Sequence, residues 1–443
     1  MGEAVQGTAV DDTEIGSYFV ANYPPFSVWT REAVEHHAMA ALGAAPAPVP
    51  LGLYLHVPFC RKRCHFCYFR VYTDKNAHEI EEYLDVMARE WELYNAYQAI
   101  SGRALNFVYF GGGTPSFLSV RQLEQLVRRL TAVSSWSQAE EITFECEPGT
   151  LTETKLAAIR GMGVTRLSLG IENFDDHILE LNGRAHRSPE IFRAYEFAQS
   201  LGFPQINIDL IAGMLGETDD NWGRCIEQTL ELEPDSVTVY QMELPFNTTI
   251  SGDVLKGEGR FNEHVASWST KRRWVDEAFN ALERAGYTVG SAYTAVKDPG
   301  RTRFIYRDRL WQGADLAGLG VASFGYINGV HLQNLDTWET YSGGIARGAL
   351  PLSRAYRPDS DERLIRELVL QLKLGRIRPS YFSNKYDVSV LDRFREPLAA
   401  LSEQGYLAEP SEDSIALTRD GLLRVDSLLR RFFQPQHAGI RYT

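Results

Sequence analysis

The sequence has little cysteine, no long apolar run and no excess of positive charge, and each of these absences excludes a class of protein. Five cysteines in 443 residues, three of them close together, make a poor disulfide framework and suit a reducing compartment. No apolar run is long enough to span a bilayer. The first twenty residues lack the basic and apolar regions of a secretory signal. We therefore expect a cytoplasmic protein without a membrane segment.

The charge balance also limits the kind of partner. The chain has 45 Lys and Arg against 58 Asp and Glu, which gives a net charge of −13. Such an acidic protein is poorly suited to bind DNA or RNA. A hydrophobic content of 44% and a charged content of 23% are ordinary for a globular protein, and the length allows a barrel-sized domain with smaller additions. The composition therefore favours a small-molecule substrate and no nucleic acid.

Short apolar runs alternate with helical patterns from residue 51 onward. Six runs predict strands: 51–57, 107–110, 141–145, 166–170, 206–212 and 236–242. The stretches between them carry apolar residues at three- and four-residue steps, which is typical of helices: 79–97, 120–133, 152–160, 188–201 and 219–231. This alternation indicates a parallel α/β sheet with helical crossovers, either doubly wound or a partial barrel.

The two ends of the chain have a different character. Residues 1–50 contain an aromatic and proline-rich patch at 22–29 and end in an Ala/Pro stretch, so we interpret them as an extension and a linker, with the patch packed on the barrel exterior. The tail predicts three helices, a short hairpin around 406–417 and a last helix. That order resembles a winged-helix module. Because the protein is acidic, we expect this module to cover the active site.

Three cysteines lie on one tight loop after the first predicted strand: Cys60, Cys64 and Cys67. Thiolates are the usual ligands of iron–sulfur clusters. Three ligands on a [4Fe–4S] cube leave one iron open, which the amino and carboxylate groups of S-adenosylmethionine (SAM) can fill, and an electron passed to SAM would release a deoxyadenosyl radical. The alternatives are a zinc site completed by His56 or His65, unrelated buried cysteines, or a redox pair.

Further candidates follow the later strands, at the edge of the sheet where ligands gather. A glycine-rich turn at 111–115 permits a close approach to the SAM amino group, although a tight loop would have the same composition. Acidic side chains and one arginine suit ribose hydroxyls, an ammonium group and a carboxylate, with solvated surface charge as the alternative: Glu145, Glu172, Asp209 and Arg184. We interpret the glycine-rich segment 318–323 as a turn that touches a ligand.

The motifs at 54–60 (YLHVPFC) and 110–115 (FGGGTP) resemble those of the radical SAM superfamily, in particular its oxygen-independent coproporphyrinogen III oxidase-like subfamily. The resemblance implies a [4Fe–4S] cluster, one or two molecules of SAM, and three domains after the extension. These are a partial (β/α)₆ barrel at 51–262, a barrel-completing α/β segment at 263–355 and a mainly helical, winged-helix-like cover domain at 356–443. By position, the residues that match the family's SAM contacts are Tyr54, Gly112, Gly113, Thr114, Glu145, Arg184 and Asp209. Glu172 stands where the subfamily usually has glutamine.

The chain departs from the subfamily on the substrate side. Tyr68 and Phe69 follow the third cysteine, where porphyrinogen oxidases typically have Gly-Cys. The segment 306–311 lacks the histidine of haem-trafficking relatives. We therefore expect a radical SAM enzyme that generates a carbon radical on a small organic substrate, by porphyrinogen-type oxidation or by methyl or methylene transfer such as cyclopropanation. The alternative is a non-catalytic haem-binding or trafficking protein. An electron donor such as flavodoxin or ferredoxin is implied, and the basic residues at 61–63 are either its docking site, an offset to cluster charge or a solvated loop.

Overall fold

The computed structural model describes residues 19–245, 248–256 and 265–440. Most of the segment considered for a secretory signal lies outside these residues. Within them, no helix combines the length and apolar character needed to cross a membrane.

A curved mixed sheet of twelve strands organises the molecule, in the order β12-β11-β10-β9-β1-β2-β3-β4-β5-β6-β8-β7. Strands β1 to β6 run parallel in sequence order, and β9 pairs parallel to β1. The sheet is therefore an open partial barrel, as predicted. Its strands are β1 (Leu51–Val57), β2 (Leu105–Gly112), β3 (Glu141–Cys146), β4 (Arg166–Glu172), β5 (Gln205–Ala212), β6 (Ser236–Gln241), β7 (Thr288–Val289), β8 (Thr294–Val296), β9 (Asp315–Leu319), β10 (Phe324–Ile327), β11 (Val330–Asn334) and β12 (Leu352–Tyr356).

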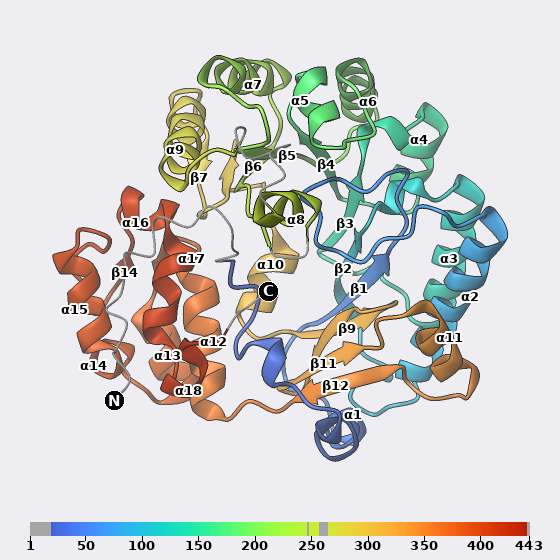
Figure 1. The fold of residues 1–443 in the computed structure, drawn as a ribbon. Coiled ribbons are helices and arrows are strands. Elements are labelled where there is room, and N and C mark those ends of the chain that lie inside the picture. Colours follow the sequence, from blue (N-terminus) through green and yellow to red (C-terminus); the bar gives the residue numbers. More distant parts are fainter. Residues whose placement is uncertain (1–18, 246–247, 257–264, 441–443) are drawn as a thin grey trace.

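The crossover helices lie around the outside of the curved sheet (Figure 1). Their amphipathic patterns bury one face on the strands, and several begin at side-chain caps, with full capping boxes at Asn76 and Ser119. The helices of this part are α1 (Met39–Gly43), α2 (Ala77–Tyr94), α3 (Val120–Val133), α4 (Glu153–Gly161), α5 (Asp176–Leu181), α6 (Ser188–Ser200), α7 (Asp219–Leu232), α8 (Thr249–Lys256), α9 (Trp268–Arg284), α10 (Ile305–Trp311) and α11 (Trp338–Ala346).

The C-terminal region is mainly helical and has its own apolar core, with a two-stranded sheet of β13 (Arg376–Ile377) and β14 (Ile415–Ala416). A single bridge between Leu407 and Leu417 stands where the hairpin was predicted. The helices are α12 (Ser360–Leu372), α13 (Pro379–Tyr386), α14 (Val390–Arg393), α15 (Arg395–Glu403), α16 (Arg419–Leu423), α17 (Val425–Leu428) and α18 (Pro435–Ala438). This agrees with the helical C-terminal region predicted from the sequence.

The aromatic N-terminal patch packs against the sheet extension and the C-terminal region. The Trp29 ring stacks on His331 of β11, with centroids 4.8 Å apart. Tyr23 is fully buried and contacts Phe433, with ring centroids 4.8 Å apart. The patch therefore joins two parts of the chain that are distant in sequence.

Only part of the glycine-rich segment 318–323 is the predicted turn: residues 320–323 connect β9 to β10, whereas Gly318 and Leu319 belong to β9. Gly318 lies within β9, where an added Cβ would come 2.1 Å from the Phe324 carbonyl oxygen. The bare backbone is therefore what allows β9 and β10 to pair. The segment also contributes nothing to the lining of the large cavity described below.

A buried carboxyl on α2 ties this extension to the barrel. Glu90 is fully buried and accepts hydrogen bonds from the Gly320 amide (2.8 Å), the Asn334 amide nitrogen (2.6 Å) and the Tyr341 hydroxyl (2.6 Å). Burial raises the pKa of Glu90 to about 8. The folded state therefore holds a proton that the unfolded state releases at lower pH, so this group stabilises the fold most at low pH and loses its contribution as the pH rises through about 8.

We expect Glu90→Gln to flatten the pH dependence of unfolding. For one such group, the free energy of unfolding changes by at most about 1.4 kcal/mol per pH unit between the pKa of the unfolded state and that of the folded state. Urea unfolding of the metal-free protein at several pH values from about 5 to about 9 measures the slope. Glu92→Gln, at an exposed position on the same helix, is the control. An equal slope in native and Glu90→Gln proteins would contradict the assignment.

Candidate functional site

The three clustered cysteines lie on the loop that follows β1. The loop is held at both ends: the Cys60 amide donates to the Tyr72 carbonyl (3.1 Å), and the His65 amide donates to the Asn182 carbonyl (3.0 Å). All three thiols are partly exposed and line one cavity. Burial raises the pKa of the Cys60 thiol to about 12, so a thiolate there requires a compensating positive charge, which iron ions would supply.

The glycine-rich turn after β2 packs directly against this loop. The Gly113 amide donates to the Val57 carbonyl (2.8 Å), and an added Cβ at Gly113 would come 3.0 Å from the Cys60 sulfur. Gly112 has a φ of 113°, which disfavours a side chain. The Thr114 hydroxyl donates to the Cys60 sulfur at 3.3 Å. The turn therefore supports the cysteine loop and leaves its backbone open to a ligand.

Arg184 connects the cysteine loop with the end of β4. Its Nη1 lies 3.4 Å from the Cys64 sulfur, its Nη2 donates to the Gly170 carbonyl at 2.6 Å, and its buried Nε has no hydrogen-bond partner. Glu172 lies 3.8 Å from Nη2. A buried guanidinium with an unused donor is suited to a carboxylate ligand.

Three carboxyl groups face the same cavity from β3, β4 and β5: Glu145, Glu172 and Asp209. Glu145 accepts a hydrogen bond from the Tyr109 hydroxyl at 2.6 Å, and Asp209 accepts one from Ser168 at 2.9 Å. Burial raises the pKa of Glu145 and of Glu172 to about 7. Glu172 also has a φ of 67°, a conformation that is uncommon outside glycine. Glu172 is thus the one of the three carboxyl residues with a left-handed backbone conformation.

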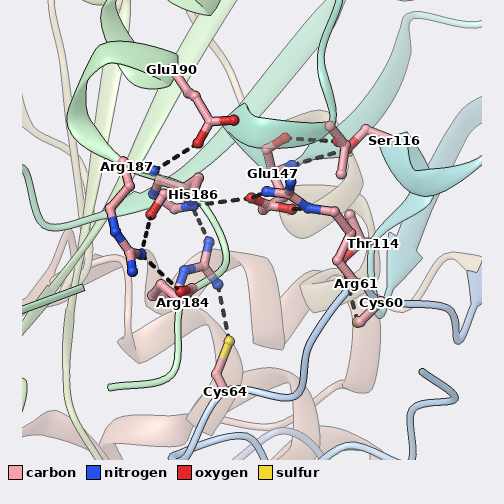
Figure 2. A network of polar contacts seen from close by, with 12 residues as sticks. Cys60, Arg61, Cys64, Thr114, Ser116, Glu147, Arg184, His186, Arg187 and Glu190 are labelled. Carbon is pink, nitrogen blue, oxygen red and sulfur yellow. Dashed lines mark hydrogen bonds and ion pairs between the residues drawn. The ribbon is translucent and has the colours of Figure 1, made fainter. Parts of the chain in front are cut away.

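A polar network joins the cysteine loop to the loops after β3 and β4 (Figure 2). Arg61 makes a forked pair with Glu147, with nitrogen–oxygen distances of 2.8 and 3.1 Å. Nδ1 of the buried His186 lies 3.3 Å from the same carboxylate. Burial alone would raise the pKa of Glu147, but the close contact with His186 and the hydrogen bonds from Arg61 lower it to about 2. Arg61 is therefore paired within the protein, not simply solvated.

The donor set fits an iron–sulfur cluster better than a single metal ion. Among the described residues, no three His, Cys, Asp or Glu side chains converge where one ion would contact all of them. A cluster does not require this, because each thiolate binds a different iron. The histidines considered as zinc ligands have other contacts: His56 shares a hydrogen bond with Tyr54 (3.2 Å), and His65 with the Leu181 carbonyl (3.0 Å).

The cavity has a volume of about 510 Å³ and brings together ten of the eleven residues selected from the sequence. These are Cys60, Cys64, Cys67, Gly112, Gly113, Thr114, Glu145, Glu172, Arg184 and Asp209. Tyr54 is the exception, because it packs behind the cavity wall against Tyr109, with ring centroids 5.9 Å apart.

Sequence reasoning missed several residues of the cavity. Arg166 at the start of β4 is buried, lies 4.1 Å from the Phe304 ring and has an Nη1 without a hydrogen-bond partner. Residues 422–427 of the C-terminal region also line the cavity. No local signal marks these positions, since their role depends on contacts between distant segments.

Comparison with known proteins agrees with this geometry. The model of the radical SAM superfamily matches residues 54–228. The chain is 28% identical over 375 residues to the heme chaperone HemW of Bacillus subtilis, covering 84% of this chain and 96% of that protein. It is 26% identical over 426 residues to the oxygen-independent coproporphyrinogen III oxidase of Escherichia coli, covering 93% and 91%.

A solved structure gives the same fold. The coproporphyrinogen III oxidase from Escherichia coli superimposes with a TM-score of 0.81 at 24% identity, covering 94% of this chain and 96% of that chain. At this identity the likeness establishes the fold alone. Together with the match to the superfamily, the comparisons identify a [4Fe–4S] cluster and SAM as the cofactors. The chain therefore contains a radical SAM superfamily domain at residues 54–228 and is similar over most of its length to oxygen-independent coproporphyrinogen III oxidase and to the heme chaperone HemW.

Proposed function

We propose that this protein is an enzyme that cleaves SAM reductively and directs the resulting radical at a small organic substrate. One observation carries the proposal: the cavity that contains the three thiols also contains the glycine turn, the three carboxyl groups and Arg184, with open space beside them. A cluster and SAM bound there would supply the carbon radical.

The residues of the chain have separate roles in this proposal. Cys60, Cys64 and Cys67 hold the cluster. The open backbone of Gly112 and Gly113 and the carboxyl groups of Glu145, Glu172 and Asp209 bind the amino and ribose groups of SAM. Arg184, whose Nη1 lies 3.4 Å from the Cys64 sulfur, orients a SAM carboxylate beside the cluster through its unused Nε. The C-terminal residues 422–427 exclude water from the cavity.

The similarity to heme chaperones supports a second candidate, a haem-binding protein that retains the cluster. The cavity favours the enzyme, because no histidine of the described residues lines it. The segment 306–311, where haem-trafficking relatives typically carry a histidine, lies in α10, and its Tyr306 packs on Tyr109 with centroids 4.3 Å apart.

Reduced, reconstituted protein supplied with SAM tests the proposal. Formation of 5′-deoxyadenosine supports the enzyme, whereas a Soret shift with added haem and no SAM cleavage would overturn it. Isotopically labelled SAM then assigns the reaction type. Label that enters a product indicates methyl or methylene transfer, and label confined to deoxyadenosine and methionine indicates hydrogen abstraction alone.

We expect Glu172 to make SAM binding depend on pH. Because its pKa is raised to about 7, the carboxyl gains a negative charge beside the cationic cosubstrate as the pH increases. The KM for SAM should therefore fall by about fivefold between about pH 6 and about pH 8, the equivalent of about 1 kcal/mol.

The Glu172→Gln variant removes this charge and should reduce that change. Steady-state formation of 5′-deoxyadenosine at each pH gives the KM values. Glu153→Gln, at an exposed position on α4, controls for general charge effects. An unchanged pH dependence in Glu172→Gln would contradict the assignment.

A further inference from the structure

A second cavity lies apart from the cysteine loop and shares no lining residue with the cavity described above. Its volume is about 610 Å³, which is within the range of about 300 to 1,000 Å³ that is typical of small-molecule sites. We name it the arginine groove. Its walls come from α1 and the linker after it, from β9 to β11, and from α13 and the segment 357–367 of the C-terminal region. Three parts of the chain that are distant in sequence therefore meet around it.

One side of the arginine groove is apolar and is held in place by Asn328. The side-chain amide of Asn328 donates to the Ala41 and Ala45 carbonyls (2.9 and 3.1 Å), and its oxygen accepts a hydrogen bond from the Ala47 amide (2.7 Å). Asn328 and Gly329 both have a positive φ, as the tight turn between β10 and β11 requires. The side chains of this segment that line the groove are aliphatic: Ala40, Ala41, Ala44, Ala45, Ala47 and Val49. A ligand group that lies against them is best apolar, because they offer no hydrogen bonds.

The carboxylates that line the groove are already neutralised. Asp315 is buried and pairs with Arg103 at 2.6 Å. Glu367 pairs with Lys385 at 2.7 Å and accepts a hydrogen bond from the Tyr381 hydroxyl at 2.6 Å. Neither carboxylate is therefore left to balance a further cation.

Two arginines of the groove have no such partner. Arg357 and Arg363 are exposed, and within the described part of the chain neither guanidinium has a hydrogen bond or an ion pair. Gly329 leaves room for one of them, since an added Cβ there would come 3.3 Å from Nη1 of Arg363. Two acidic residues at the start of α12 are occupied elsewhere, because Asp359 caps the helix and Asp361 forms an ion pair outside the groove. The groove therefore has two positive charges in excess, in a protein whose net charge is −13.

These features indicate the charge and the shape of a ligand. Guanidinium groups form forked hydrogen bonds with phosphate and carboxylate oxygens. A phosphate monoester carries a charge of about −1.5 to −2 near pH 7, which matches two arginines, whereas a carboxylate carries a single charge. The methyl groups of the segment 40–49 then suit an apolar group attached to the phosphate.

We propose that the arginine groove is a second binding site and that it takes a phosphate monoester with an apolar body. The phosphate contacts Arg357 and Arg363, and the body lies against the segment 40–49. This goes beyond the proposed function, because no residue of the groove belongs to the cavity that contains the thiols. A ligand there contacts the N-terminal segment and the C-terminal region at once, so it also strengthens the contact between them.

Three probes separate the contribution of the phosphate from that of the apolar body. Butyl phosphate has both, inorganic phosphate has no body, and pentanoate has an apolar chain of similar length with a single charge. Calorimetric titration of the reconstituted full-length protein in phosphate-free buffer should show that butyl phosphate binds about tenfold more tightly than either of the other probes. Equal affinity for butyl phosphate and either other probe would overturn the proposal, and so would the absence of saturable binding at millimolar concentration.

Charge variants assign the binding to the groove. Arg363→Gln should weaken butyl phosphate binding by about tenfold. Ser360→Glu, which places a negative charge in the groove at the first residue of α12, should do the same with both arginines kept. It is expected to fold, because acidic residues are favourable in the first turn of a helix.

Arg347→Gln is the matched control for these variants, since Arg347 is exposed but lies outside the groove. It should bind butyl phosphate as the native protein does. Native affinity in both Arg363→Gln and Ser360→Glu, or a loss of affinity in Arg347→Gln, would contradict the proposal.

The outcomes also separate this inference from the proposed function. SAM cleavage by the three variants should match that of the native protein, because the groove and the cavity share no lining residue. Binding of butyl phosphate without any SAM cleavage by the native protein would overturn the enzyme but keep the second site. SAM cleavage without binding of butyl phosphate would do the reverse.

Discussion

Replacing Cys64 by alanine is expected to abolish cluster assembly and SAM cleavage together. The three thiols line one wall of the cavity, and removal of one leaves a second iron without a protein ligand. The same change removes the sulfur that lies 3.4 Å from Arg184 Nη1, so the arginine loses the contact that orients it. We therefore expect iron content, the electron paramagnetic resonance signal of the reduced cluster and 5′-deoxyadenosine formation all to fall to background.

Cys225→Ala is the matched control for this experiment. Cys225 is buried in α7 and does not line the cavity, so its replacement should leave iron content and SAM cleavage nearly unchanged. A Cys64→Ala protein that kept full iron content and SAM cleavage would disprove the cluster assignment.

The second large effect is expected from Gly149→Ala, a change outside the cysteine loop. Gly149 follows β3, and an added Cβ would come 2.1 Å from Nη2 of Arg61 and 2.9 Å from Glu190. Arg61 would have to leave its forked pair with Glu147, at 2.8 and 3.1 Å (Figure 2). That pair is a link between the cysteine loop and the barrel, and loss of such outer contacts typically lowers metal affinity or activity by about 10- to 100-fold.

Iron retention during dialysis against a chelator measures this effect directly, and SAM cleavage gives a second readout. Gly161→Ala provides the control, because an added Cβ there meets nothing within 4 Å. If Gly149→Ala kept iron as well as Gly161→Ala does, the Arg61–Glu147 pair would not support the cluster loop. Arg61→Lys separates charge from geometry, since lysine keeps the charge but not the forked contact.

The positions at which the sequence departs from the pattern expected of its relatives bear on the choice of substrate. The cysteine loop, the glycine turn and Arg184 match the pattern that the sequence resemblance implies, and the fold superimposes on coproporphyrinogen III oxidase over nearly its whole length. Tyr68, Phe69 and Glu172 are the positions expected to depart from that pattern. Tyr68 and Phe69 line the cavity beside Cys67, and Glu172 lies 3.8 Å from Arg184, so all three positions face the cavity. This distribution is expected when the cofactor chemistry is kept and the substrate changes.

The sequence by itself determined the barrel and most of the cofactor site. The six predicted strands match β1 to β6 within two residues at each end, because alternation of apolar runs with helical periodicity is a local property. Parallel strands in sequence order bring their carboxyl ends to one edge of the sheet. The proximity of residues near the ends of β1 to β5 can therefore be predicted even when no side-chain contact is known. Ten of the eleven selected residues therefore line one cavity.

Only the tertiary structure decided how that edge is completed. Gly318 lies in a strand, although the glycine-rich composition of this segment predicted a turn. Glycine is needed there because a side chain would collide with the backbone of Phe324. The pairing of Arg61 with Glu147 spans 86 residues, and the cavity lining by residues 422–427 comes from the other end of the chain. Local patterns carry no information on such contacts, because they depend on how the C-terminal region and the loops pack. The three cysteines thus predict the chemistry, whereas the shape offered to a substrate arises only when distant segments meet around them.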